Sequence, residues 1–179
     1  MGLFDRFRKP KNVARITFTD PQFGVFAFIK DLCWFEGIIS IQGKEISVTL
    51  ETKESVKALH HIYPDIENLI EKASRYAAET LLDGSNVYGY DAWANEIIDE
   101  HDLPHMTEGE FNVWLNQNLP DKKYIPLKTD DFIKHIRLLS IHLSECGAYS
   151  LVYDDGDLFW GHQISVGGDM KSGFTNADI

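Results

Sequence analysis

Residues 149–179 of this 179-residue chain read YSLVYDDGDLFWGHQISVGGDMKSGFTNADI, and this stretch indicates an antiparallel β-ribbon. Residues 151–153 and 158–166 are rich in β-branched and aromatic side chains, which are typical of strands. Between them lies the sequence Asp154-Asp155-Gly156-Asp157. Asp-Gly is a strong hairpin signal, because both residues tolerate the positive φ angles of a tight turn. We therefore predict two strands joined by a tight turn at residues 154–157.

The second run has a two-residue period, so its side chains alternate between the two faces of a strand. Five of them share one face: Leu158, Trp160, His162, Ile164 and Val166. Because this face is apolar except for His162, we expect the ribbon to belong to a sheet that covers a core. Residues 167–179 are rich in turn formers, and Phe174 and Ile179 are candidate anchors for this tail.

The first third of the chain also has a two-residue period. Residues 23–30, 33–42 and 45–51 each read as strands, and residues 13–19 are a candidate for a fourth at the edge. In residues 45–51 the alternation is complete, with Ile46, Val48 and Leu50 on the apolar face. These runs predict a meander of antiparallel strands.

The middle of the chain changes to a helical period. A short helix capped by Thr52 or Ser55 is followed by a longer one over residues 65–81, and a third is expected over residues 92–100. Thr107 and Glu110 have the spacing of a capping box, which predicts the start of a fourth helix. Residues 136–143 fit either a helix or a strand, and the turn that follows them favours the strand.

This order of elements predicts an α+β fold. The mostly antiparallel sheet is built from N- and C-terminal strand meanders, with a central block of about four helices. We expect a single domain over residues 13–179, preceded by a flexible basic segment at residues 1–12.

Composition limits the classes of partner. The formal net charge of −11 disfavours contact with nucleic-acid phosphates and favours a basic protein partner. The chain has no apolar run long enough to span a membrane, and its first residues, MGLFDRFRKPK, do not resemble a secretory signal. A cytoplasmic location follows, in which Cys33 and Cys146 are expected to be reduced, buried thiols.

Four carboxyl and imidazole side chains form the first candidate site: Asp154, Asp155, Asp157 and His162. Carboxylates at a turn can hold Ca²⁺ or Mg²⁺, but the spacing does not match an EF-hand loop. Turn formation alone also explains these aspartates, and a histidine bonded within the sheet also explains His162. The sequence contains no GxSxG, GxxxxGK[ST] or GxGxxG motif, so we predict no cofactor, metal or catalytic residue.

A second candidate site mixes aromatic and acidic residues: Tyr88, Tyr90, Asp91, Trp93, Glu96, Asp99 and Glu100. Aromatic side chains are common interface anchors, and carboxylates would steer a basic partner. The alternative is that Tyr90 and Trp93 are core residues and the acids form a solvated face.

Three segments resemble a known family. Residues 157–162 with Gly168-Asp169 and residues 173–175, residues 20–24, and residues 34–37 are similar to the bacterial family called domain of unknown function 2262. The resemblance covers about residues 18–179 and implies strands, helices and a closing meander. It implies no catalytic residues, and some members resemble immunity proteins encoded beside secreted toxins.

Taken together, the sequence favours a non-enzymatic protein-binding module, in its most specific form an immunity-like inhibitor of a basic toxin. The alternative is a small metal-dependent hydrolase that uses the cluster of Asp154, Asp155, Asp157 and His162. A third option is a module that senses a small ligand.

Overall fold

The computed structural model describes residues 16–82, 92–104, 106–122, 128–156, 158–159 and 161–179. The expected basic segment at residues 1–12 lies outside these ranges. Eight strands are described: β1 (Thr17–Asp20), β2 (Gly24–Ile29), β3 (Trp34–Ile41), β4 (Lys44–Leu50), β5 (Arg137–Leu143), β6 (Ala148–Asp154), β7 (Gln163–Asp169) and β8 (Gly173–Asp178).

The described helices lie between β4 and β5 in the chain. They are α1 (Val56–Ile62), a 3₁₀ turn η1 (Tyr63–Asp65), α2 (Ile66–Leu81), α3 (Ala92–Glu100), α4 (Glu108–Asn118) and α5 (Thr129–His135). The capping box of α4 forms as predicted, with the Thr107 side chain accepting from the backbone of Glu110 and the Glu110 side chain accepting from the backbone of Thr107.

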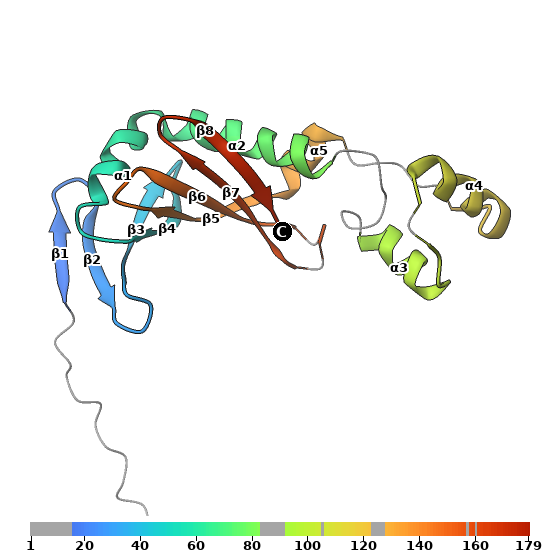
Figure 1. Cartoon of the computed structure of the whole chain (residues 1–179), viewed down its shortest axis with the longest axis horizontal. Coiled ribbons are helices and arrows are strands. Elements are labelled where there is room, and N and C mark those ends of the chain that lie inside the picture. Colours follow the sequence, from blue (N-terminus) through green and yellow to red (C-terminus); the bar gives the residue numbers. More distant parts are fainter. Residues whose placement is uncertain (1–15, 83–91, 105, 123–127, 157, 160) are drawn as a thin grey trace, which may run out of the picture.

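The described strands form one sheet in the order β1 to β8, so each strand pairs with its neighbours in the chain (Figure 1). Every pairing is antiparallel except β4 with β5, which is parallel. A parallel pair needs a long crossover connection, and the helical block supplies it. The predicted α+β fold, with strand meanders at both ends of the chain and helices in the middle, is confirmed at this level.

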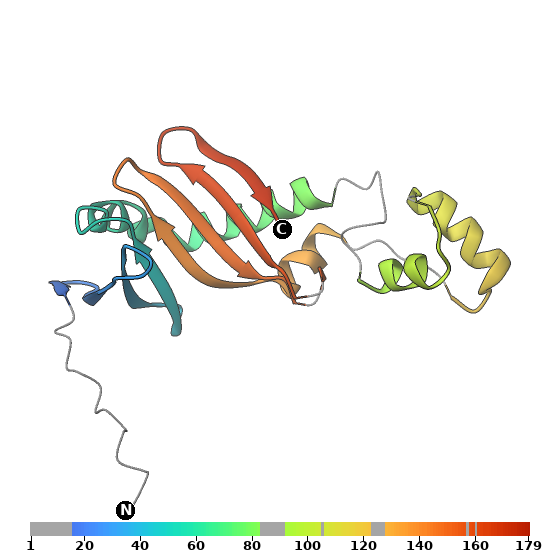
Figure 2. The ribbon, with the colours of Figure 1, turned by 60° about the horizontal axis from the view of Figure 1, so that its bottom comes forward.

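The described helices that pack on the sheet, α1, α2 and α5, share one core with its strands. Along β3, β6 and β7 every second residue is buried, as the strand period requires, and the buried side chains belong to this core. Ala73 and Ala77 of α2 are fully buried, so their small side chains let the helix approach the strands closely. Figure 2 shows α2 passing behind the C-terminal strands while the other face carries no helix.

Two helices, α3 and α4, surround a hydrophobic cluster of their own. Ala94 and Ile98 of α3 are buried with Phe111 and Leu115 of α4, and no residue of the sheet belongs to this cluster. In Figure 1 these helices lie beside the sheet, beyond the end of α2. We call α3 and α4 the helical pair.

Two predictions about the closing ribbon are wrong. The second strand begins at Gln163, not at residue 158, so no tight turn joins β6, which ends at Asp154, to β7; we call the connection between these two residues the wide loop. Phe159, expected to point away from the apolar face, is 2% exposed and packs in the main core. The expected turn-rich tail contains a strand, β8, which pairs with β7 across an irregularity at Gly167 and Gly168.

Two further differences concern a helix and the cysteines. The short helix α5 was not predicted, because its seven residues hold a single fully buried side chain, Phe132. Cys33 and Cys146 are exposed thiols, not buried ones, because both lie in the turns that precede β3 and β6. Cys33 has a positive φ of 57° that its turn imposes.

Candidate functional site

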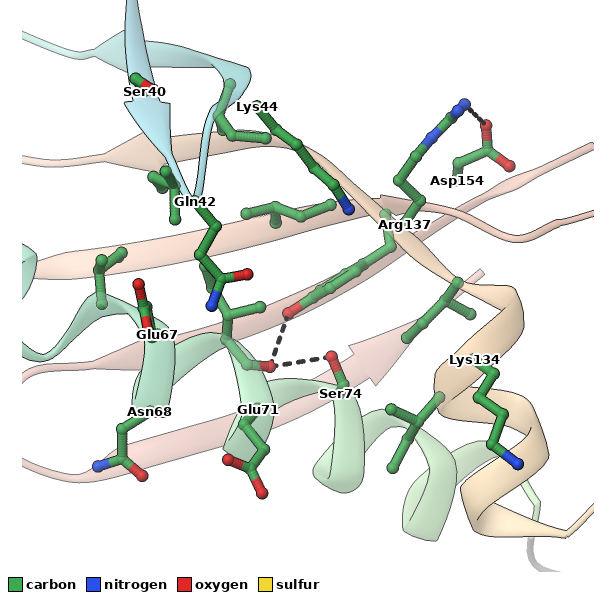
Figure 3. Close-up of a pocket in the computed structure, with 18 of the residues that line it drawn as sticks. Ser40, Gln42, Lys44, Glu67, Asn68, Glu71, Ser74, Lys134, Arg137 and Asp154 are labelled. Atoms are coloured by element: carbon green, nitrogen blue, oxygen red, sulfur yellow. Dashed lines mark hydrogen bonds and ion pairs between the residues drawn. The ribbon is translucent and has the colours of Figure 1, made fainter.

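A groove of about 1130 Å³ lies at one end of the sheet (Figure 3). The β3–β4 turn, the first half of α2, the end of α5 and the start of β5 form its walls.

A buried tyrosine forms the floor of the groove. Tyr153 is 1% exposed, and its hydroxyl donates to the carbonyl oxygen of Ile70 at 3.3 Å. The Ser74 hydroxyl donates to the same oxygen at 2.9 Å, as drawn in Figure 3. Burial raises the pKa of Tyr153 to about 12, so the phenol stays protonated and acts as a hydrogen-bond donor.

The walls of the groove carry charges of both signs. Lys44 and Arg137 come from the strands, whereas Glu67 and Glu71 come from α2 on the opposite side (Figure 3). Arg137 donates to Asp154 at 2.7 Å, and among the described residues Lys44 has no ion-pair partner. This arrangement can bind a polar ligand or chain that carries charges of both signs.

The first predicted cluster is divided between separate structural roles. Asp154 lies on the rim of the groove, where the backbone N–H of Gly156 and the guanidinium of Arg137 lower the pKa of its carboxyl group. His162 is exposed at the end of the wide loop, and its backbone N–H donates to the carbonyl oxygen of Phe159 at 3.2 Å. Asp157 lies outside the described residues. The idea that His162 packs within a strand is wrong.

Asp155 organises the wide loop from inside. Its carboxylate is 1% exposed and accepts the backbone N–H groups of Phe159 at 2.7 Å and Gly161 at 3.2 Å. The bonds fold the loop back so that Phe159 enters the core. Across the described ranges, no three histidine, cysteine or acidic side chains gather around a common point that could hold a metal ion.

The second predicted site falls partly on the helical pair. Tyr88, Tyr90 and Asp91 lie outside the described residues, and of Trp93 only the backbone, in α3, is described. Glu96, Asp99 and Glu100 are exposed on α3, on the side away from the buried Ala94 and Ile98.

The acidic surface extends further than the sequence prediction. Residues 92–122 contain seven carboxylates and a single basic residue, Lys122. Three more of these carboxylates are exposed in the structure: Asp102, Glu110 and Asp121. The sequence prediction considered only acids close to aromatic residues and therefore missed these three. The excess of acidic over basic residues in this segment is the sequence signal that indicates them.

The carboxylates of the helical pair are not neutralised by ion pairs within the described structure. Among the described residues, none of those in residues 92–122 forms an ion pair with a cation. The backbone and hydroxyl of Thr107 lower the pKa of Glu110, so this side chain is ionised at neutral pH. The described part of this surface is therefore negative, and no ion pair within it offsets the charge.

A comparison of the sequence with known families identifies the chain's relatives. A family described as an uncharacterised protein conserved in bacteria, DUF2262, matches residues 20–179. The chain belongs to this family. No curated protein and no solved structure matches it. None of the described helices is long and apolar enough to cross a membrane.

Proposed function

We propose that this DUF2262 protein is a non-enzymatic cytoplasmic module that binds a basic protein through its helical pair. The observation that carries the proposal is the exposed acidic face of α3, where Glu96, Asp99 and Glu100 form no ion pair with a described residue. Negative charges gathered on one surface raise the rate of encounter with a positively charged partner, and they repel the phosphates of nucleic acids. In this proposal residues 13–179 act as one α+β domain, with the helical pair appended to it.

The helical pair also has the apolar side chains that an interface needs. Val113 is 57% exposed on α4, and the ring of Trp114 is only partly buried against its cluster. Exposed apolar side chains beside polar residues are the usual anchors of protein interfaces, whose rims are polar. The cluster between α3 and α4 holds this surface in a fixed shape before a partner arrives.

We further propose that the partner is a toxin and that the protein acts as its immunity-like inhibitor. The similarity of some family members to immunity proteins supports this step, together with the negative charge that would cover a basic active site. A metal-dependent hydrolase is not our proposal, because Asp154 and Asp155 are engaged by Arg137 and by loop amides.

Affinity capture with three forms of the protein tests the proposal. The forms are the natural protein, the triple variant Glu96→Gln, Asp99→Asn, Glu100→Gln, and a matched control in which Asp31→Asn, Glu45→Gln and Glu54→Gln remove three exposed charges elsewhere. We expect the natural protein and the control to retain a basic protein at 50 mM salt and to release it at 500 mM. The helical-pair variant should bind it roughly tenfold more weakly or worse.

Equal retention by both triple variants would contradict the helical pair as the docking surface. The toxin step has its own test, which is growth of cells that express a toxin encoded beside this gene. Co-expression of the natural protein should restore growth, and the helical-pair variant should restore it less. If the natural protein captures a basic partner but no adjacent toxin is neutralised, the immunity step fails and the binding proposal stands.

A further inference from the structure

A hollow of about 740 Å³ lies on strands β2 to β5. The strand register places Ala27 opposite Glu36, and Ile38 opposite Ser47. Along β2 and β3 these residues alternate with side chains of the main core, so they project to the face opposite α1, α2 and α5 (Figure 2). The hollow belongs to neither predicted site, and no residue of the helical pair lines it.

The lining of the hollow is mainly apolar. Its apolar side chains come from β2, β3 and β5, and they are Val25, Ala27, Ile29, Ile38 and Leu139. Val25 is 59% exposed and Ile38 is 61% exposed, although both lie within strands of the sheet. Apolar side chains gathered on one surface mark a place where another chain or a ligand docks.

The charged side chains that line the hollow are both acidic. Glu36 and Glu45 are exposed on β3 and β4, and neither forms an ion pair with a described residue. Glu36 accepts the hydroxyl of Ser47 at 3.3 Å, which ties its carboxylate to the neighbouring strand. An occupant that combines apolar side chains with positive charges therefore fits this lining.

The first fifteen residues of the chain have this combination. They lie outside the described residues, and they contain a single acidic residue and the large apolar side chains Leu3, Phe4 and Phe7. Their five basic residues are Arg6, Arg8, Lys9, Lys11 and Arg15. In composition this segment complements both the apolar and the acidic part of the hollow.

The segment joins the sheet beside the hollow. The carbonyl oxygen of Ile16 accepts the backbone N–H of Phe28 at 2.7 Å, so residue 16 is held against β2, which forms one wall of the hollow. Neighbouring strands lie about 4.8 Å apart, so β2 to β5 span only about 15 Å. Fifteen residues reach up to about 50 Å when extended. The covalent link also supplies an effective concentration on the order of millimolar, so even weak contacts hold the segment in place.

We propose that residues 1–15 dock in this hollow and cover its apolar lining. The two phenylalanines of the segment contact Val25 and Ile38, and its basic side chains face the carboxylates of Glu36 and Glu45. The docked segment removes exposed apolar surface from water and offsets the two unpaired charges. The site lies on a different surface from the helical pair and does not depend on the protein-binding proposal.

Photo-cross-linking of the full chain tests the proposal. Phe7 is replaced by p-benzoylphenylalanine, the protein is irradiated, and mass spectrometry of its peptides locates the link. We expect a link within one molecule to peptides of β2 and β3 that contain Val25 or Ile38. The matched control has the same photoreactive residue in place of Val113, which is 57% exposed on α4, and should not link to these strands.

Substitutions in the hollow test whether its lining holds the segment. Val25→Gln with Ile38→Gln removes the two exposed apolar side chains and should lower the yield of the link roughly tenfold. Both positions are exposed, so the variant should fold, which circular dichroism checks. The photoreactive residue in place of Phe4 gives an independent reading of the same contact.

A mixture of isotope-labelled and unlabelled protein separates the possible occupants. Links between labelled and unlabelled copies would show that a second copy of the chain fills the hollow. No link to β2 or β3 from either position, or an equal yield in the hollow variant, would leave the hollow to a different partner. Each of these results, like a link of equal yield from the control at Val113, would overturn the proposal.

Discussion

Asp154 and Asp155 are neighbours in the chain but have opposite environments. Asp154 is at the surface beside Arg137, whereas Asp155 is 1% exposed and accepts two loop amides. A buried carboxylate with its donors in place costs far more to remove than an exposed ion pair. Of these two aspartates, Asp155 therefore contributes more to the stability of the fold.

Alanine substitutions at these two positions form a matched pair. Asp155→Ala leaves the buried N–H of Phe159 and the partly buried N–H of Gly161 without this acceptor, so we expect the free energy of unfolding to fall by about 1–3 kcal/mol. Asp154→Ala removes a solvent-exposed ion pair and should change stability much less. Urea denaturation of both variants at pH 7 measures the difference. Equal losses would show that the loop does not depend on the buried carboxylate.

Asp20 joins the β1–β2 turn to α1. It is 7% exposed and accepts the backbone N–H groups of Gln22 and Phe23, and its other oxygen lies 2.8 Å from Nε2 of His60. Burial alone would raise the pKa of Asp20, but the hydrogen bonds from His60, Gln22 and Phe23 outweigh it and lower the pKa.

The lowered pKa of Asp20 predicts a pH dependence with a definite sign. The ionised carboxylate stabilises the fold above its ordinary value of 3.8, and this contribution is lost as the pH falls from there through the lowered value. Asp20→Asn should therefore be less stable than the natural protein at pH 6, with the gap narrowing below pH 4. Urea midpoints measured from pH 2.5 to 7 test this. A gap that is constant with pH would contradict it.

At the scale of elements, the helical pair should unfold independently of the sheet. Its cluster is built from Ala94, Ile98, Phe111 and Leu115 and shares no residue with the main core. Phe111→Ala should lower the free energy of unfolding of the helical pair by about 3–5 kcal/mol, because it leaves a cavity in a small cluster. Hydrogen exchange should then speed up in residues 92–122 while β5 to β7 keep their protection.

The control for this prediction is Leu151→Ala, which removes a fully buried side chain from β6. It should accelerate exchange throughout the sheet. If Phe111→Ala loosens β5 to β7 as strongly as Leu151→Ala does, the helical pair is part of the main core and the account of its independence is wrong.

Elements with a strong local period were predictable from the sequence. Ile46, Val48 and Leu50 are buried in β4 as their alternation indicates, and the capping box of Thr107 starts α4. Such signals are local, so the rest of the fold does not alter them. The parallel pairing of β4 with β5 depends on where the chain re-enters the sheet after the helical block. No local sequence pattern indicates that position.

The wide loop after β6 shows why the rest was not predictable. Asp-Gly at residues 155–156 has the composition of a tight turn, but a buried carboxylate that caps two amides stabilises a longer loop instead. The same difference between local and long-range signals decides which surface features could be predicted from the sequence. Glu96, Asp99 and Glu100 were identifiable as an acidic helix face, whereas the hollow at Ile38 combines four strands and follows only from their register.

At the scale of the whole molecule, the fold separates three surfaces. One face of the sheet is used for the core, the opposite face carries the hollow at Ile38, and the helical pair carries the exposed carboxylates. A partner that docks on the helical pair would leave the sheet and its hollow unchanged.

Hydrogen exchange of the protein with its captured basic partner bound tests the central claim most directly. The account predicts that binding slows exchange in residues 92–122 and leaves β3 to β6 and the groove at Tyr153 unchanged. Protection that falls on the sheet or the groove, with the helical pair unaffected, would contradict it.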